Sequence, residues 1–393
     1  MRILFLTKKF PFPPKDGECM AINSAARSLR DAGESIDLLA INTLKHYTDP
    51  LSVRLIDTPF SHIDSVTVDT NPKTLPLLKS LIGGKSYNLD RFNSAQFAEH
   101  LSTTLSEHRY SVVQLEGVHM YHYIPLIRKL SDAKIVLRSH NVEYEVWEKL
   151  AERESGWKKT LFGILAKRIR AIETKALETV DGVVTLTEND AQKFRQLGYN
   201  GPLMAMPIGI GVDDDEPVFH QAVRFFHIGS MDWLPNVEGL KWFVSNVWNH
   251  VNVAYPALQL HLAGRCFPDK LFSDERGVVV YGEVESSKRF VHSNDVLVVP
   301  LFSGSGVRLK ILEAMSLGKA VVSTSKGAEG IPYTHDENIL IADDAAAFVE
   351  QIKRCLKEPE LLKRLGGNAK RLIRERYNPA DVGQQLLMFY VSL

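Results

Sequence analysis

The sequence predicts an α/β protein made of two doubly wound domains, and three observations point to this fold class. Short runs rich in β-branched and apolar residues alternate with longer segments of helical periodicity, which is the pattern of parallel sheets covered by helices. Several of these runs are continuously apolar, as buried parallel strands are. The chain has 393 residues, and at roughly 100 to 200 residues per domain this length predicts two domains.

The strands expected from this alternation form two series. The first contains residues 2–7, 36–41, 112–115, 135–137 and 183–186. The second contains residues 225–228, 258–263, 278–281, 296–300 and 320–323. The segments between the strands have helical patterns, and the first of them has an apolar face formed by Ile22, Ala25, Ala26 and Leu29. Gly33 follows this helix as its expected C-cap.

The best candidate for a domain boundary is the stretch 201–218. It is rich in glycine and proline, contains three consecutive aspartates and lacks apolar periodicity. A division here gives two α/β units of similar size. Two such domains facing each other form a central cleft, and ligands of these sheets bind at the C-terminal strand ends, which open into it.

Charge and cysteine content exclude several classes of protein. The 47 basic residues balance the 47 acidic residues and the formal net charge is +0, so we expect no nucleic-acid partner. Cys19, Cys266 and Cys355 are too far apart and too few for a disulfide framework, which favours a reducing, cytoplasmic setting. No window approaches the ~20 apolar residues of a membrane span, and the N-terminus lacks the apolar core of a signal peptide.

The most informative segment is 296–324, in which a strand, a small-residue loop and a helix follow one another. The strand ends at Pro300, and the helix is expected from about Gly306 to Gly318. The loop between them contains Ser303, Gly304, Ser305 and Gly306. Small residues let a ligand approach the free N–H groups at the positive end of the helix dipole, which suits a phosphate or a diphosphate.

Two charged residues lie on one face of this expected helix. Lys310 and Glu313 are close enough in sequence to share that face. Lys310 can neutralise a phosphate there, and Glu313 can accept hydrogen bonds from ribose hydroxyls. The alternative interpretation is a surface ion pair that contributes roughly a few tenths of a kcal/mol.

The residues from Gly304 to Thr324, followed by GAEGI at 327–331, resemble the donor-site helix of family 4 glycosyltransferases. Other segments occur in the family's order and resemble its first glycine-containing loop, its HNVE segment, the end of its first domain and the start of its second: 11–17, 137–150, 181–194 and 226–243. The resemblance implies the GT-B fold, in which two Rossmann-like domains face a central cleft. It also implies retaining, metal-independent transfer of a sugar from a nucleoside diphosphate sugar to an acceptor hydroxyl.

The same resemblance assigns a role to each domain. Residues 1–205, completed by a C-terminal helix at 378–393, would form the acceptor-side domain. Residues 206–377 would form the domain that binds the nucleotide-sugar donor. No cofactor is implied beyond the donor substrate itself.

Carried over residue by residue, the resemblance makes Glu313 the ribose-binding carboxylate. The partner glutamate of the family's E-x7-E pair falls at Ser305, which is a departure from the pattern. The basic residues that usually follow the first strand of the second domain are replaced by Gly229 and Ser230. Arg308 and Lys310 would then supply the positive charge, beside the backbone of Gly304 and Gly306 in the loop.

Three further site residues are implied. His140 matches the histidine that contacts the donor sugar and the reacting centre in the family; otherwise it is a structural histidine after a strand. Gly17 either lets the backbone approach the diphosphate or the acceptor, or is a turn glycine. Arg265 either holds the nucleotide base or pairs with a surface carboxylate.

The segment 156–177 combines lysines and arginines with Trp157 and Phe162. Such a helix can contact an anionic membrane surface, or it can pack on a sheet with a solvated basic face. We therefore expect a hexosyltransferase of cell-surface polysaccharide or glycolipid synthesis, with a nucleotide-sugar donor and a glycan or lipid-linked acceptor. The alternatives are a nucleotide-sugar epimerase or hydrolase of the same fold, and a catalytically silent binding module, which Ser305 favours.

Overall fold

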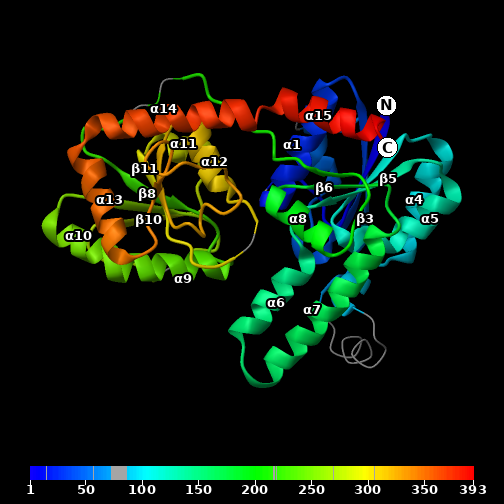
Figure 1. Cartoon of the computed structure of the whole chain (residues 1–393), viewed down its shortest axis with the longest axis horizontal. Helices are drawn as coiled ribbons and strands as arrows, with labels where there is room; N and C mark the ends of the chain where they lie inside the picture. The colour runs from blue at the N-terminus through cyan, green and yellow to red at the C-terminus, as the bar shows by residue number, and fades with distance from the viewer. Residues whose placement is uncertain are drawn as a thin grey trace. The chain divides into compact units, whose positions relative to one another are not determined.

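The computed structural model describes residues 1–14, 16–55, 57–71, 86–215, 217, 219–268, 270–304 and 306–393. The chain divides into two compact units (Figure 1). The first contains Met1–Gly209 together with Pro379–Leu393, and the second contains Ile210–Asn378. The division therefore falls inside the glycine-rich and proline-rich stretch 201–218. The assignment of acceptor and donor roles to the two units stays a prediction.

The described part of the first unit contains a seven-stranded parallel sheet with the strand order β3-β2-β1-β4-β5-β6-β7. Its strands are β1 (Arg2–Thr7), β2 (Ser35–Thr43), β3 (His62–Val68), β4 (Val112–Glu116), β5 (Lys134–Ser139), β6 (Gly182–Thr185) and β7 (Leu203–Ala205). Thr7, Glu116 and Arg138 are paired across the C-terminal ends of β1, β4 and β5. The strand order reverses between β1 and β4, and doubly wound sheets bind ligands beside such a point.

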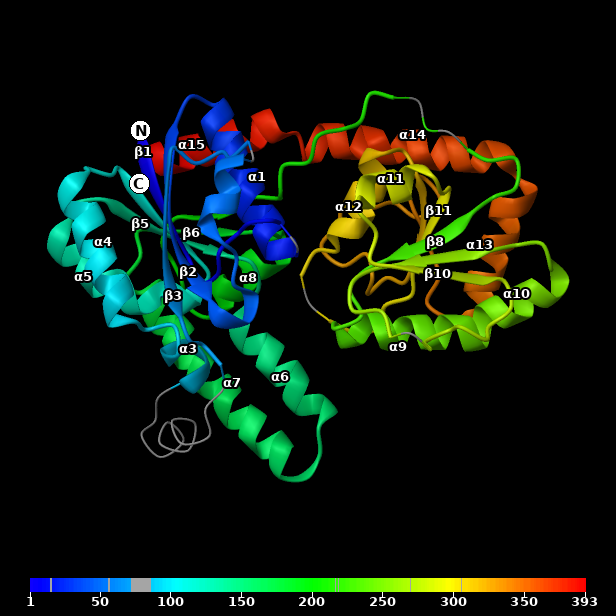
Figure 2. The same cartoon turned by 180° about the vertical axis from the view of Figure 1, so that it is seen from behind.

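Helices cover both faces of this sheet. They are α1 (Gly17–Asp31), α3 (Tyr87–Asp90), α4 (Ala95–Glu107), α5 (Ile124–Leu130), α6 (Glu143–Arg153), α7 (Gly156–Leu177), α8 (Glu188–Gln196) and α15 (Pro379–Val391). Ile3 and Phe5 of β1 pack in one core with α1 and α15, whereas Leu4 and Leu6 pack in the other with α4, α5 and α7. This alternation buries β1 on both faces, as expected of a parallel sheet. The pair α6 and α7 extends away from the sheet (Figure 2).

The second unit is built on the same plan. Its described sheet has the parallel order β10-β9-β8-β11-β12-β13. The strands are β8 (Phe225–Ile228), β9 (Leu260–Ala263), β10 (Val278–Gly282), β11 (Val296–Val299), β12 (Ala320–Ser323) and β13 (Leu340–Ile341). The strand order reverses between β8 and β11.

The helices of this unit again cover both faces of the sheet. They are α9 (Leu234–Phe243), α10 (Asn249–Ala254), α11 (Ser287–His292), α12 (Leu309–Ser316), α13 (Ala345–Lys357) and α14 (Pro359–Arg376). Phe225 packs in one core with α9 and α13, and the next residue, Phe226, packs in the other with α11, α12 and α14. The predicted fold class, two doubly wound Rossmann-like units, is confirmed.

The predicted start of one helix, α12, is wrong. The helix expected from Gly306 begins at Leu309, and Arg308 is its N-cap. Gly304 and Gly306 have φ angles of 100° and 81°, a left-handed backbone that cannot continue into a helix. The loop after β11 is therefore longer than predicted, and Arg308 belongs to the loop and not to the helix.

Candidate functional site

The loop between β11 and α12 is braced by its own arginine. Arg308 is 5% exposed, and its guanidinium lies over the ring of Trp233, 5.0 Å from the centroid. It donates hydrogen bonds to the carbonyl oxygens of Gly306, at 2.5 Å, and Ser303, at 3.4 Å. A Cβ atom at Gly304 would lie only 2.7 Å from Trp233, so the arginine, the tryptophan and the glycine fix the loop together. Ser305 lies outside the described residues.

Lys310 lies in the first turn of α12 and is held by two polar partners. Its Nζ is 2.9 Å from Asn236 Oδ1 and 3.0 Å from His227 Nε2. His227 Nδ1 lies 2.7 Å from the carbonyl oxygen of Val298, so Nδ1 carries the proton and Nε2 accepts from Lys310. Burial and the neighbouring Lys310 hold the pKa of His227 well below its usual range. Burial and Arg308 lower the pKa of Lys310 to about 7.

Two glycines make room for this lysine at the C-terminal ends of β8 and β9. A Cβ atom on Gly229 would lie 2.5 Å from Lys310 Nζ. Gly264 has a φ of +153°, and its Cβ would overlap the carbonyl oxygen of Gly229. Any larger residue at either position would displace Lys310 or the backbone of Gly229. Gly229 thus stands where the family has a basic residue, and its lack of a side chain leaves the space that the Lys310 ammonium occupies.

The predicted residues Ser230 and Arg265 lie beside these glycines. Asn236, the partner of Lys310, donates to the carbonyl oxygen of Ser230 at 2.8 Å. The backbone N–H of Met231 donates to the carbonyl oxygen of Arg265 at 2.9 Å. The turns after β8 and β9 are therefore joined to each other and to the partner of Lys310.

Glu313 lies one turn further along α12 and lines a pocket. The pocket has a volume of about 430 Å³ and is also lined by Asp213, Ser287, Lys288 and Leu317. Burial raises the pKa of Glu313 to about 7, although the attraction of Lys310 opposes the rise. A hollow of this size is in the range that small-molecule ligands occupy. The structure thus places Glu313 in the wall of a pocket that can accept a ligand, one turn along α12 from Lys310.

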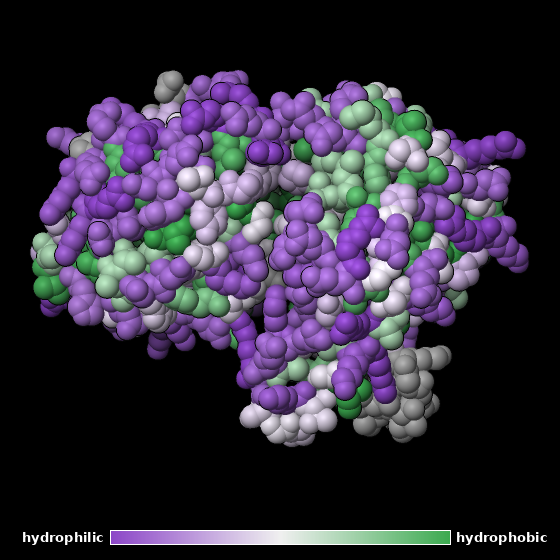
Figure 3. All heavy atoms as spheres, viewed as in Figure 1, coloured by the Kyte–Doolittle hydropathy of each residue, from purple (hydrophilic) through white to green (hydrophobic). Residues whose placement is uncertain are grey.

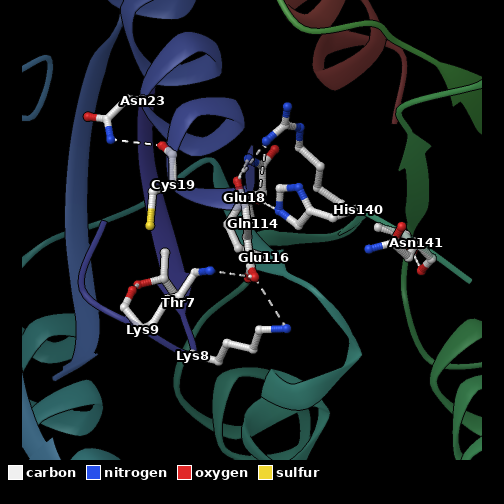
Figure 4. A network of polar contacts seen from close by, with 12 residues as sticks. Thr7, Lys8, Lys9, Glu18, Cys19, Asn23, Gln114, Glu116, His140 and Asn141 are labelled. Atoms are coloured by element: carbon white, nitrogen blue, oxygen red, sulfur yellow. Dashed lines mark hydrogen bonds and ion pairs between the residues drawn. The ribbon is translucent and has the colours of Figure 1, made fainter. Parts of the chain in front are cut away.

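In the first unit, His140 is part of a buried polar network (Figure 4). Its Nε2 lies 2.6 Å from Oε2 of Glu116, the last residue of β4. Arg138 and Gln114 also donate to this carboxylate, at 3.2 Å and 2.5 Å. Although burial opposes ionisation, Arg138 and His140 lower the pKa of Glu116.

This arrangement decides which ring nitrogen of His140 is available. An ionised carboxylate only accepts hydrogen bonds, so Nε2 of His140 must donate to Glu116. Nδ1 is buried and has no hydrogen-bond partner among the described residues. His140 therefore keeps one unused hydrogen-bond acceptor, Nδ1. The ring is held next to Glu116, at the end of β4, where the strand order reverses.

The loop after β1 contributes a second polar cluster to this edge of the sheet. Lys8 lies 3.4 Å from Glu18 and 3.4 Å from His119 Nδ1, and Lys9 lies 3.0 Å from Glu18. Burial opposes ionisation of Glu18, but Lys8 and Lys9 hold its pKa far below the usual range. Gly17 is exposed and is the first residue of α1. The charged side chains beside it belong to Asp16 and Glu18, which both pair with Lys9.

A buried carboxyl group, whose pKa is raised to about 8 by burial, anchors the segment that follows His140. Glu173 of α7 is 1% exposed and accepts hydrogen bonds from the backbone N–H groups of Glu143 and Tyr144, at 2.9 Å and 2.8 Å. These are the first two residues of α6, whose N–H groups have no partner within the helix. Glu173 therefore caps α6 from outside and fixes the HNVE segment.

Several of these side chains were not predicted from the sequence: Glu116, Glu18, His119, Glu173, His227 and Asn236. Glu116 could have been found, because it follows an expected strand that neighbours the strand before His140. His227 sits in an apolar strand and Glu173 in an amphipathic helix, where neither has a sequence signal. Among the described residues, no group of three or more His, Cys, Asp or Glu side chains is placed to hold a metal ion. The predicted metal independence stays a prediction.

Comparison with known proteins finds a family match in the second unit. Residues 222–358 match the family model described as glycosyl transferases group 1, and they span β8 to α13 with the loop and helix that carry Arg308, Lys310 and Glu313. This segment of the second unit is similar to the group 1 glycosyl transferases. The predicted resemblance to a glycosyltransferase family is confirmed, whereas membership of family 4 and retention of configuration stay predictions.

The whole chain has relatives of matching length. It is 22% identical over 404 residues to an uncharacterized 44.6 kDa protein in the cps region of Klebsiella pneumoniae, with 97% of each chain covered. It is similar in structure to sucrose-phosphate synthase from Thermosynechococcus elongatus, with a TM-score of 0.71, 18% identity and coverage of 100% and 99%. It is also similar to Anabaena HepE in complex with UDP-glucose, with a TM-score of 0.65, 16% identity and 100% of both chains covered. The predicted GT-B fold is confirmed.

Proposed function

We propose that this glycosyltransferase transfers a hexosyl group from a UDP-sugar to a hydroxyl of a glycan or lipid-linked acceptor in polysaccharide synthesis. The solved structure of HepE with UDP-glucose supports a UDP-sugar donor. The relative in the cps region of Klebsiella pneumoniae supports a role in polysaccharide synthesis. Retention of configuration and independence of metal ions are part of the proposal and rest on the resemblance to family 4.

The observation that carries the proposal is the placement of Lys310 and Glu313. Lys310 stands at the strand ends of the second unit, where Gly229 leaves room for its ammonium. Together with the Arg308 loop it would bind the diphosphate, and its charge would stabilise the leaving group as the sugar departs. Glu313, in the wall of the 430 Å³ pocket, would accept hydrogen bonds from the ribose hydroxyls.

In the first unit, we assign His140 to the donor sugar. Its Nε2–H is committed to Glu116 at 2.6 Å, and its buried Nδ1 can accept a hydrogen bond from a sugar hydroxyl. Glu116 would hold the ring in the required tautomer, as a carboxylate does for a catalytic histidine. Glu18, held between Lys8 and Lys9, lies in the segment that we assign to the acceptor side in place of Gly17.

We also propose a peripheral contact of the helix pair α6 and α7 with an anionic membrane from the cytoplasmic side. Within the described ranges, no helix has the length and apolar character needed to cross a membrane. Trp157, at the start of α7, is 72% exposed, and Lys158 and Lys159 beside it are also exposed. The free end of the pair carries hydrophilic and less polar residues side by side (Figure 3), a mixture that suits the lipid headgroup region.

The test is a product assay on the full chain with radiolabelled UDP-glucose, UDP-galactose and UDP-N-acetylglucosamine, in a chelating buffer, with short glycans and lipid-linked sugars as acceptors. Transfer from one donor to one class of acceptor, with the anomer identified by NMR, is the expected result. Free or epimerised sugar without an acceptor would indicate a hydrolase or an epimerase. Donor binding without turnover on any acceptor would indicate the silent binding module.

A further inference from the structure

The network around His140 continues to the C-terminal helix. The hydroxyl of Tyr390, in α15, is hydrogen-bonded to Gln114 Oε1. Gln114 Nε2 donates to Glu116 Oε1 at 2.5 Å, and Glu116 Oε2 accepts from His140 Nε2 at 2.6 Å. Tyr390 is 3% exposed, and Gln114 and Glu116 are each 0% exposed. The three residues that connect α15 to the imidazole of His140 are therefore shielded from bulk water.

The direction of every hydrogen bond in this chain is determined. Because the carboxylate of Glu116 only accepts, the amide of Gln114 must turn its NH2 group toward it. The amide oxygen of Gln114 then faces Tyr390, which must donate. Burial raises the pKa of Tyr390 well above its usual range, so its hydroxyl keeps the proton that this bond requires.

Close packing of α15 against the rest of the first unit holds Tyr390 in place. A Cβ atom on Gly383 would lie 2.2 Å from the carbonyl oxygen of Ser28, so α15 approaches α1 more closely than another residue would allow. A Cβ atom on Gly182 would lie 2.9 Å from both Phe389 and Leu393. Leu386, Phe389 and Tyr390 pack in the core shared with α1. Two glycines therefore set how deeply α15 inserts, and thereby where the hydroxyl of Tyr390 lies.

We propose that Tyr390 is a positioning residue for His140, which acts by orienting the amide of Gln114 and, through Glu116, by selecting the imidazole tautomer with the proton on Nε2. The inference deepens the proposed function and rests on it for its effect on catalysis. Without the Tyr390 hydroxyl, the Gln114 amide oxygen is left buried without a donor. The amide can then turn its oxygen toward Glu116, whose carboxyl group has lost one donor and is protonated more easily. A protonated carboxyl group donates to Nε2, so the ring can carry its proton on Nδ1 and the fixed acceptor at Nδ1 is lost.

The tautomer of His140 can be measured without any substrate. We would record long-range ¹H–¹⁵N spectra of the full chain with ¹⁵N-labelled histidine, in the alkaline range where imidazole rings are neutral. The signal of His140 is assigned as the one missing from His140→Gln. The wild type should show a single Nε2–H tautomer, and Tyr390→Phe should show both tautomers. The wild-type pattern in Tyr390→Phe would overturn the inference.

Turnover is the second readout, measured as UDP release from UDP-glucose. Tyr390→Phe should lower kcat roughly fivefold to tenfold with little change in KM, because the lost group touches no substrate. If Tyr390→Phe does not fold, Gln114→Met breaks the same chain at the next link and should redistribute the tautomers in the same way.

Tyr110→Phe is the matched control. Tyr110 precedes β4 and is also buried, at 6% exposure. Its hydroxyl donates a hydrogen bond to Asp37 at 2.8 Å. The Tyr110→Phe variant should lose about as much stability as Tyr390→Phe. It should keep the wild-type kcat and the wild-type tautomer of His140. Equal losses of kcat in both variants, in proportion to their Tm, would mean that Tyr390 only supports the fold. If His140→Ala transfers sugar at the wild-type rate while Tyr390→Phe still redistributes the tautomers, the proposed role of His140 fails and the positioning by Tyr390 stands.

Discussion

The ammonium of Lys310 lies 3.0 Å from Nε2 of His227, a buried imidazole whose other nitrogen donates to the carbonyl of Val298 at 2.7 Å. The histidine is therefore a neutral acceptor and gives the lysine no countercharge. Burial and Arg308 lower the pKa of Lys310 to about 7. A diphosphate bound beside it would supply the missing negative charge and restore the proton.

Binding of UDP should therefore take up a proton. Lys310 is charged below its pKa of about 7 and loses its charge above it, so metal-free UDP affinity should fall as the pH rises from 7 to about 8.5. Calorimetry at about pH 8, in two buffers of different ionisation enthalpy, should detect the uptake. Lys310→Met should abolish it and weaken binding by about 1–3 kcal/mol. The exposed Lys353→Met serves as control, and proton uptake that persists in Lys310→Met would assign it to another group.

Glu313→Ala should weaken UDP binding by about 1–3 kcal/mol, through the loss of hydrogen bonds to the ribose. The wild type should lose a similar amount with 2′-deoxy-UDP, whereas Glu313→Ala should no longer distinguish the two nucleotides. Because the pKa of Glu313 is raised to about 7, its preference for ribose should strengthen as the pH rises through 7, opposite to the effect of Lys310. A variant that still distinguishes the nucleotides would refute the role of Glu313.

Glu116→Gln should separate catalysis from nucleotide binding. The substitution removes the charge that fixes the Nε2–H tautomer of His140, so kcat for transfer should fall by roughly 100-fold or more. UDP affinity should stay at the wild-type value, because the residues assigned to the nucleotide lie in the second unit. His140→Ala should behave in the same way. A parallel loss of UDP affinity would place His140 and Glu116 in a different role.

Glu173→Ala should destabilise the first unit by about 1–2 kcal/mol, because it leaves the buried N–H groups of Glu143 and Tyr144 without their acceptor. Glu173→Gln keeps one carbonyl oxygen and should cost less. Chemical denaturation of both variants measures the difference, with the exposed Glu152→Ala as control. Equal stability of Glu173→Ala and Glu152→Ala would show that the cap contributes nothing.

Substitution of the exposed end of α7 tests the membrane contact. Trp157→Ser combined with Lys158→Glu and Lys159→Glu should remove binding to vesicles that contain phosphatidylglycerol, since both the aromatic anchor and the positive charge are lost. Met388→Ser, which changes another exposed apolar residue, of 61% exposure, should leave sedimentation with these vesicles unchanged. Binding that persists in the triple variant would exclude this surface.

The sequence was sufficient to predict the central strands of both sheets and the edge strand β10, but not the other three edge strands. β3, β7 and β13, which were not predicted, each lie at the end of a sheet. β3 has alternating exposed and partly buried residues, and β7 and β13 are only three and two residues long. An edge strand is covered on fewer sides, so its sequence carries less of the continuous apolar signal on which the prediction depended.

The candidate site was predictable where side chains follow strand ends and not where they meet across the fold. The sequence placed Lys310, Glu313 and His140 after expected strands, and the structure keeps them there. The contacts that set their charge and orientation come from His227, Asn236, Glu116 and Tyr390. Tyr390 is separated from Gln114 by 276 positions. Only the packed fold brings such residues together, and no local pattern marks them.

The most direct test of the central claim is a thermal-shift panel of nucleoside diphosphates on the full chain in a chelating buffer. A ligand at about a hundred times its Kd adds roughly 2.7 kcal/mol, which corresponds to a rise in Tm of about 5 to 10 °C. We predict that UDP raises Tm by this amount without metal, that the other bases do not, and that Lys310→Met and Glu313→Ala lose most of the shift. The absence of any shift in a protein shown to be folded would contradict the assignment of the second unit as a nucleotide-sugar site.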